Sequence, residues 1–121
     1  MPRLTATQIK AALPSVPNWR RKGRNIVRTF EFKDFVVAMK FVNAVAVAAE
    51  KAWHHPDIDV RWNKVLLALS THSEGGLTAK DFDLAGRFDV IAARFKAAGR
   101  ISVSGKIEAK AGVAREPRND E

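Results

Sequence analysis

Hydrophobic and polar positions follow two different periods along this chain, and the two periods predict its elements. Residues 25–32 fit a period of two, which predicts a strand that pairs across Gly23-Arg24 with residues 19–22. Apolar residues of the segment 34–53 instead recur every three or four positions. This spacing, behind an aspartate at position 34 that can cap the first turn, predicts a long amphipathic helix.

Both patterns return in the second half of the chain. Residues 59–62 and 64–71 are rich in valine, leucine and tryptophan and predict a second hairpin around Asn63. Further on, Thr78 has an acidic residue, Asp81, three positions later, which is an acidic variant of the capping box. A buried stripe at three- and four-residue spacing follows, so we expect a last helix that ends near residues 98–99.

A short helix opens the chain, capped by Thr5 or Thr7 and running through Leu13. The order helix, hairpin, helix, hairpin, helix has no strand-helix-strand repeat and therefore does not require a parallel sheet. It predicts an α+β fold in which a four-stranded antiparallel sheet carries three helices packed on one face. We expect one domain over residues 1–99 and a loosely ordered polar tail over residues 100–121.

Composition narrows the class of protein further. The chain has 121 residues, enough for one ordinary core, and it has no cysteine, which excludes disulfides, a cysteine nucleophile and thiolate metal sites. No apolar run approaches the ~18 residues of a membrane span, and the N-terminus does not resemble a secretion signal. We therefore expect a soluble, cytoplasmic protein without a membrane partner.

The chain has a net charge of +8, and the first predicted hairpin carries its densest cluster of basic residues. Such a cluster could attract a polyanion through counterion release. It is also typical of a solvated sheet edge, where basic side chains discourage pairing with another chain, and we favour that interpretation over nucleic-acid binding. The residues are Arg20, Arg21, Lys22, Arg24 and Arg28.

All three histidines of the chain lie in one short segment, and imidazole is the side chain that titrates closest to neutral pH. Pro56 disfavours the helical conformation at His55, so we expect the long helix to stop at the pair, with one histidine in its last turn. His54 and His55 would then project into one pocket, which His72 would enter from a strand end. This arrangement suits proton transfer.

Glu50 lies one helical turn before His54, close enough to hydrogen-bond the imidazole and fix its tautomer. Each residue taken alone also fits an ordinary surface position, and the argument for a site rests on their association. Three histidines could instead bind zinc and leave a position open for water. The chain has no His-x-His or His-x-x-x-His pair, so we expect no metal.

A set of motifs with specific spacing runs through the chain: Ala49-Glu50, His54-His55-Pro56, Trp62-Asn63-Lys64-Val65, Thr71-His72, Gly76-Leu77-Thr78 and Asp81. With these motifs the chain resembles the pterin-4a-carbinolamine dehydratase family, and the resemblance extends over roughly residues 4–98. It implies an antiparallel four-stranded sheet with helices on one side. It also implies dehydration of 4a-hydroxytetrahydropterin to quinonoid dihydropterin, in tetrahydrobiopterin-type recycling, by a cofactor-free homodimer or homotetramer.

The resemblance also implies the site residues. His54, His55 and His72 would be catalytic, and we expect His54, held by Glu50, and His72 to be the acid/base partners while His55 orients the pterin. A non-catalytic protein-binding module, similar to a transcriptional coactivator, is the alternative. The implied substrate contacts are Trp53, His54, His55, Ser70, Thr71, His72 and Ser73.

Overall fold

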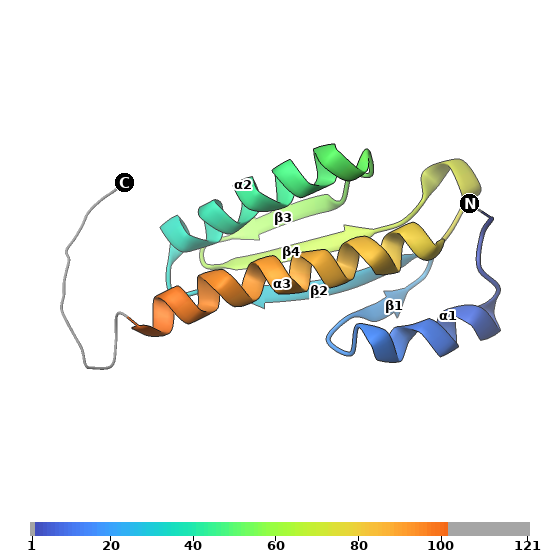
Figure 1. Ribbon diagram of the computed structural model, residues 1–121, viewed down its shortest axis with the longest axis horizontal. Helices are drawn as coiled ribbons and strands as arrows, with labels where there is room; N and C mark the ends of the chain where they lie inside the picture. The colour runs from blue at the N-terminus through green and yellow to red at the C-terminus, as the bar shows by residue number, and fades with distance from the viewer. Residues whose placement is uncertain (1, 102–121) are drawn as a thin grey trace.

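The computed structural model describes residues 2–101, which form an antiparallel sheet and the helices that cover it (Figure 1). The four strands are arranged in the order β1-β2-β4-β3. The elements in chain order are α1 (Ala6–Ala12), the 3-10 turn η1 (Leu13–Ser15), β1 (Arg20–Lys22), β2 (Asn25–Glu31), α2 (Phe35–Ala52), β3 (Asp57–Arg61), β4 (Lys64–Leu69), the 3-10 turn η2 (His72–Glu74) and α3 (Ala79–Ile101).

Helices α2 and α3 lie across one face of the sheet, and the core fills the space between these layers (Figure 1). Three aromatic side chains have no exposed surface: Phe30 of β2, Phe41 of α2 and Phe88 of α3. Burying a side chain of this size contributes ~1.5–3 kcal/mol, so these three account for much of the cohesion between layers. The α+β fold expected from the sequence, with three α-helices and a four-stranded antiparallel sheet, is confirmed.

The ends of the two long helices differ from the expected ones. Helix α2 ends at Ala52, so both members of the histidine pair lie beyond the helix instead of one occupying its last turn. Helix α3 continues through Ile101, past the expected end at residues 98–99. From residue 102 onward, the expected tail over residues 100–121 lies outside the described residues. Among the helices described, none is long and apolar enough to cross a membrane.

The sheet register brings two distant chain segments to the same end of the sheet. Strands β3 and β4 are antiparallel, and Asp57, the first residue of β3, pairs with Ala68 near the end of β4. The segment that enters β3 carries His54 and His55, while the segment that leaves β4 carries His72. All three histidines therefore lie near one end of the sheet.

A partly buried charge network ties the sheet to α3 away from that end. Asp89 accepts hydrogen bonds from Trp19 Nε1, at 2.8 Å, and from an Arg28 guanidinium nitrogen, at 2.6 Å. Partial burial, followed by the nearby charge of Arg28, lowers the pKa of Lys96 on the same helix. The side chain of Arg28 thus faces the helices. It is separate from the basic residues of edge strand β1, which are exposed.

Candidate functional site

The site begins where α2 ends, at a tryptophan in the left-handed conformation. Trp53 has φ 53° and ψ 43°, a region that a residue with a Cβ occupies at a cost of ~1–2 kcal/mol. Its N–H bonds to the carbonyl of Glu50, and the N–H of His54 bonds to that of Ala49, which together form a Schellman motif. The motif satisfies the last helical carbonyls and reverses the chain direction just before the histidines.

The reversal turns His54 inward, onto a buried aspartate. The side chain of His54 is only 12% exposed, and its Nε2 lies 2.6 Å from Oδ1 of Asp81, which has no exposed surface. The other carboxylate oxygen of Asp81 accepts the N–H of Thr78 at 2.9 Å, the N-terminal cap of α3. One aspartate therefore both caps a helix and holds the imidazole.

Two buried threonines complete the support behind the histidine. The Thr71 hydroxyl donates to Asp81 Oδ2 at 2.8 Å, and the hydroxyls of Thr71 and Thr78 lie 2.8 Å apart. Because the proton of Thr71 is already engaged, Thr78 is the donor of the second bond, and its oxygen accepts the N–H of Lys80. Because the Asp81 carboxylate is the acceptor in these bonds, it also accepts a hydrogen bond from Nε2–H of His54. The other ring nitrogen, Nδ1, is then the one that can exchange a proton.

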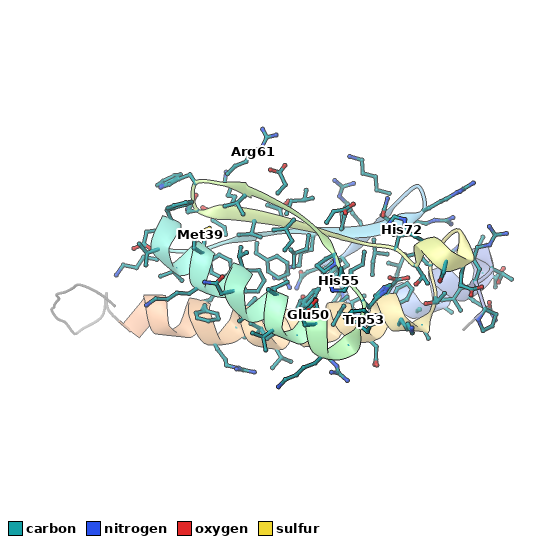
Figure 2. The ribbon with its side chains drawn as sticks, turned by 90° about the horizontal axis from the view of Figure 1, so that it is seen from above. Met39, Glu50, Trp53, His55, Arg61 and His72 are labelled. Atoms are coloured by element: carbon teal, nitrogen blue, oxygen red, sulfur yellow. The ribbon has the colours of Figure 1, made fainter. Side chains whose placement is uncertain are left out.

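Glu50 contacts His55, whereas the sequence argument had assigned it to His54. Its Oε2 lies 2.6 Å from Nε2 of His55, and both side chains are more than half exposed (Figure 2). The earlier assignment was wrong because it extended the helical i,i+4 geometry to His54. The helix has already ended, so His54 points to Asp81 instead. The Trp53 ring meets the His55 ring edge-on, with centroids 5.6 Å apart.

The residues expected around the third histidine have different surroundings. His72 is exposed and starts η2 instead of continuing the strand, because β4 ends at Leu69. Ser70 is buried and Ser73 is exposed. Within residues 2–101, no hydrogen bond joins the imidazole of His72 to either of the other histidines. Figure 2 shows His55 and His72 toward the same end of the sheet.

A cavity of about 240 Å³ opens beside His54, between the end of α2 and the first turns of α3. Besides the imidazole, its lining includes Lys51, Lys80 and Arg87, together with one acidic side chain, Asp83. The sequence analysis did not identify these residues. Lys80 precedes the cap residue Asp81, and Asp83 lies two positions after it. The available signal was therefore the predicted start of a helix shortly after the histidine motif.

The donors in this region suit proton transfer better than metal binding. Among the described residues, no group of three or more histidine, cysteine, aspartate or glutamate side chains is placed to hold a metal ion. His54 and His55 each face a different carboxylate, and the Nε2 atom of each ring is engaged there. The fold and the site together define a small α+β protein with a carboxylate-supported histidine.

Comparison with known proteins agrees with this class. Residues 2–91 match the profile of the family described as pterin 4 alpha carbinolamine dehydratase. A relative from Picosynechococcus is 53% identical over 72% of this chain and 95% of its own length. Another, from Acidobacterium capsulatum, is 53% identical over 75% of this chain and 99% of its own. Both are named after pterin-4-alpha-carbinolamine dehydratase, and this chain belongs to that family.

Solved structures show the same fold. The crystal structure of a transcriptional coactivator/pterin dehydratase from Brucella melitensis has a TM-score of 0.72 and 38% identity, and the match covers 74% of this chain and 98% of that one. A pterin dehydratase-like protein described as a RuBisCO assembly factor of the alpha-carboxysome has a TM-score of 0.56 at 24% identity, over 62% and 89% of the two chains. The second likeness concerns the fold alone.

Proposed function

We propose that this protein dehydrates a pterin-4a-carbinolamine, releasing water and a quinonoid dihydropterin. One observation carries the proposal: His54 is held from behind by the buried carboxylate of Asp81, at 2.6 Å, beside an open cavity. A histidine with a fixed tautomer and one remaining nitrogen is a suitable general acid or base. Membership of the dehydratase family supports the choice of substrate.

The reaction needs two proton transfers and no covalent intermediate. The C4a–O bond breaks as an acid protonates the departing hydroxyl group, and the C4a–N5 double bond forms as a base removes the N5 proton. The products are one water molecule and the quinonoid pterin, so the atoms balance without an oxidant, a metal or a cofactor. Two groups of suitable basicity are therefore sufficient.

We assign these steps to His54 and His72, and the orientation of the pterin to His55 and Trp53. The segment before β3, which carries His54 and His55, and the segment after β4, which carries His72, adjoin the same end of the sheet. This supports a joint site. His54 exchanges its proton through Nδ1, because Asp81 occupies Nε2. Glu50 fixes the ring of His55. Ser70, Thr71 and Ser73 adjoin His72, and among them Thr71 acts through Asp81.

In the cell, we propose a homodimer or homotetramer that recycles a tetrahydrobiopterin-type cofactor in the cytoplasm. The likeness to the dehydratase family supports the oligomer, and a chain without cysteine needs no oxidising compartment. Light scattering coupled to size-exclusion chromatography measures the oligomer directly. A monomer at micromolar concentration would contradict this part of the proposal.

Dehydration of a synthetic 4a-carbinolamine, followed by absorbance against the spontaneous reaction, tests the activity. The wild-type protein should accelerate the loss of the carbinolamine in proportion to protein concentration. Alanine variants of each histidine then test the roles, with Asn43→Ala, an exposed polar position on α2, as the matched control. A wild-type rate equal to the spontaneous one would favour the protein-binding module.

A further inference from the structure

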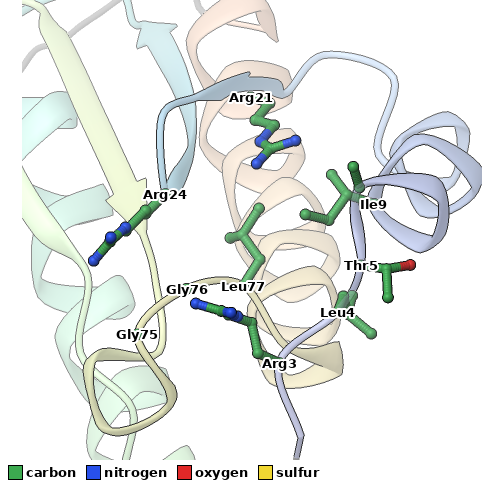
Figure 3. A pocket seen from close by; sticks show the side chains of 10 residues that line it. Arg3, Leu4, Thr5, Ile9, Arg21, Arg24, Gly75, Gly76 and Leu77 are labelled. Carbon is green, nitrogen blue, oxygen red and sulfur yellow. The ribbon is translucent and has the colours of Figure 1, made fainter.

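A second cavity, of about 360 Å³, lies between the N-terminal segment, the β1–β2 turn and the loop after η2. Its volume falls at the lower end of the ~300–1,000 Å³ that small-molecule pockets span. Three arginines line it: Arg3 from the N-terminal segment, and Arg21 and Arg24 from the β1–β2 hairpin (Figure 3). In Figure 3 the side chain of Leu77 lies between those of Arg21 and Arg3, and the side chain of Arg24 extends away from Arg21 at the left of the view.

These three charges lack acidic partners. Within residues 2–101, no carboxylate lines the cavity, and none forms a salt bridge with any of the three guanidinium groups. The Nε of Arg21 donates to the backbone carbonyl of Gly23 at 3.0 Å, which leaves its terminal nitrogens available. Like charges that share a concave wall repel one another, so an anion bound among them would relieve that repulsion.

The position of Arg3 is built into the backbone. The N–H of Leu4 donates to the carbonyl of Leu77 at 2.8 Å, which fixes the N-terminal segment beside the loop. The stem of Arg3 lies against Gly76, where an added Cβ would approach its Cδ to 2.8 Å. A side chain at position 76 would therefore displace Arg3 from its place against the loop.

The remaining lining indicates which kind of anion fits. Next to the guanidinium groups, the wall presents the apolar side chains of Leu4, Ile9 and Leu77. Guanidinium groups match the oxygens of a phosphate with forked hydrogen bonds, and an apolar wall matches an organic substituent. We propose that this cavity binds a small phosphate-bearing molecule through Arg3, Arg21 and Arg24, at a site separate from the histidines.

The cavity also assigns a role to part of the basic cluster that the sequence analysis attributed to a solvated edge. Arg21 lies in β1 and Arg24 in the turn between β1 and β2, and residues of the N-terminal segment line the same cavity. A concave space of this volume, open to solvent, fits one phosphate group and a small substituent. The proposal is independent of the dehydration chemistry, because it involves none of the histidines.

Isothermal titration of the full chain with inorganic phosphate and with phenyl phosphate tests the site. Saturable binding should weaken about tenfold or more in Arg3→Gln and in Arg24→Gln, since each loses a charge-assisted contact. Gly76→Ala should weaken binding as well, by displacing Arg3. The matched control is Arg61→Gln, an exposed arginine outside the cavity, which should bind as the wild type does. Circular dichroism and carbinolamine dehydration establish that each variant is folded.

The two probes distinguish the source of the phosphate. Tighter binding of phenyl phosphate indicates an organic phosphate that uses the apolar wall, and equal binding indicates free phosphate. Absence of saturable binding by both probes would overturn the proposal. Equal affinities in Arg3→Gln, Arg61→Gln and the wild type would also overturn it, as would salt-sensitive binding of an oligonucleotide alone.

Discussion

Asp81 holds His54 by a 2.6 Å contact between Oδ1 and Nε2, and the same carboxylate caps the first turn of α3. The imidazole is thus fixed to the helix that closes the core. Helix capping and histidine orientation share one side chain, so the position of the proton-transfer group depends on the packing of α3. This relationship leads to predictions that separate the two roles.

Asp81→Asn should lower kcat about 10- to 100-fold while the protein stays folded. The amide oxygen can still accept the Thr78 N–H, and its NH2 then faces Nε2 of His54, which forces the ring proton onto Nδ1. Steady-state dehydration kinetics measure the effect. Asp34→Asn is the matched control, because Asp34 caps α2 through the N–H of Val37 and has no contact with a histidine. A wild-type kcat in Asp81→Asn would contradict the assignment.

Glu50→Gln should have a much smaller effect than Asp81→Asn. Its contact with His55 is solvent-exposed, and exposed pairs of this kind contribute ~0–1 kcal/mol. We expect unchanged stability and a modest change in KM, measured by urea denaturation and by initial rates. A fall in kcat as large as that of Asp81→Asn would instead show that Glu50 is the principal support of the histidine site.

Thr71→Val should reduce the free energy of unfolding by about 1–3 kcal/mol, because Thr78 and Asp81 each lose a buried hydrogen-bond partner. Thr71→Ser keeps the hydroxyl and is the matched control. Urea denaturation of both variants measures the difference between them. If the valine variant proves as stable as the serine variant, the hydroxyl has no supporting role.

Trp53→Gly should stabilise the fold by about 0.5–1 kcal/mol and raise Tm by a few degrees. Glycine removes the cost of the left-handed conformation, and Trp53 is 76% exposed, so little packing is lost. The same change should raise KM for the carbinolamine about three- to tenfold if the indole stacks on the pterin. A lower Tm would show that Trp53 stabilises the helix end.

The periods of hydrophobic and polar residues were sufficient for the elements and the fold class. The alternation over residues 25–32 predicted a strand, and in the structure Phe30 is buried while Thr29 is exposed. The spacing after Asp34 predicted the helix in the same way. These features depend on local alternation and capping, which neighbouring residues determine. The shared location of the histidines at one end of the sheet was predictable as well, because the segments before and after an antiparallel hairpin meet at the same end.

The partners of the histidines could not be derived in the same way. Pro56 indicated a helix end, but the left-handed Trp53 moves that end to Ala52, and no local signal favours tryptophan there. The contact of His54 with Asp81 joins residues 27 positions apart through the packing of α3 on α2. The sequence pattern indicated Asp81 as a cap and as part of the family resemblance, but its contact with His54 exists only after the helices have packed.

The most direct test of the central claim is the rate of carbinolamine dehydration by His54→Ala relative to the wild type, at saturating substrate. Loss of a general acid or base should reduce this rate about 10²- to 10⁴-fold, with the variant folded by circular dichroism. A His54→Ala protein that dehydrates the carbinolamine at the wild-type rate would contradict the account.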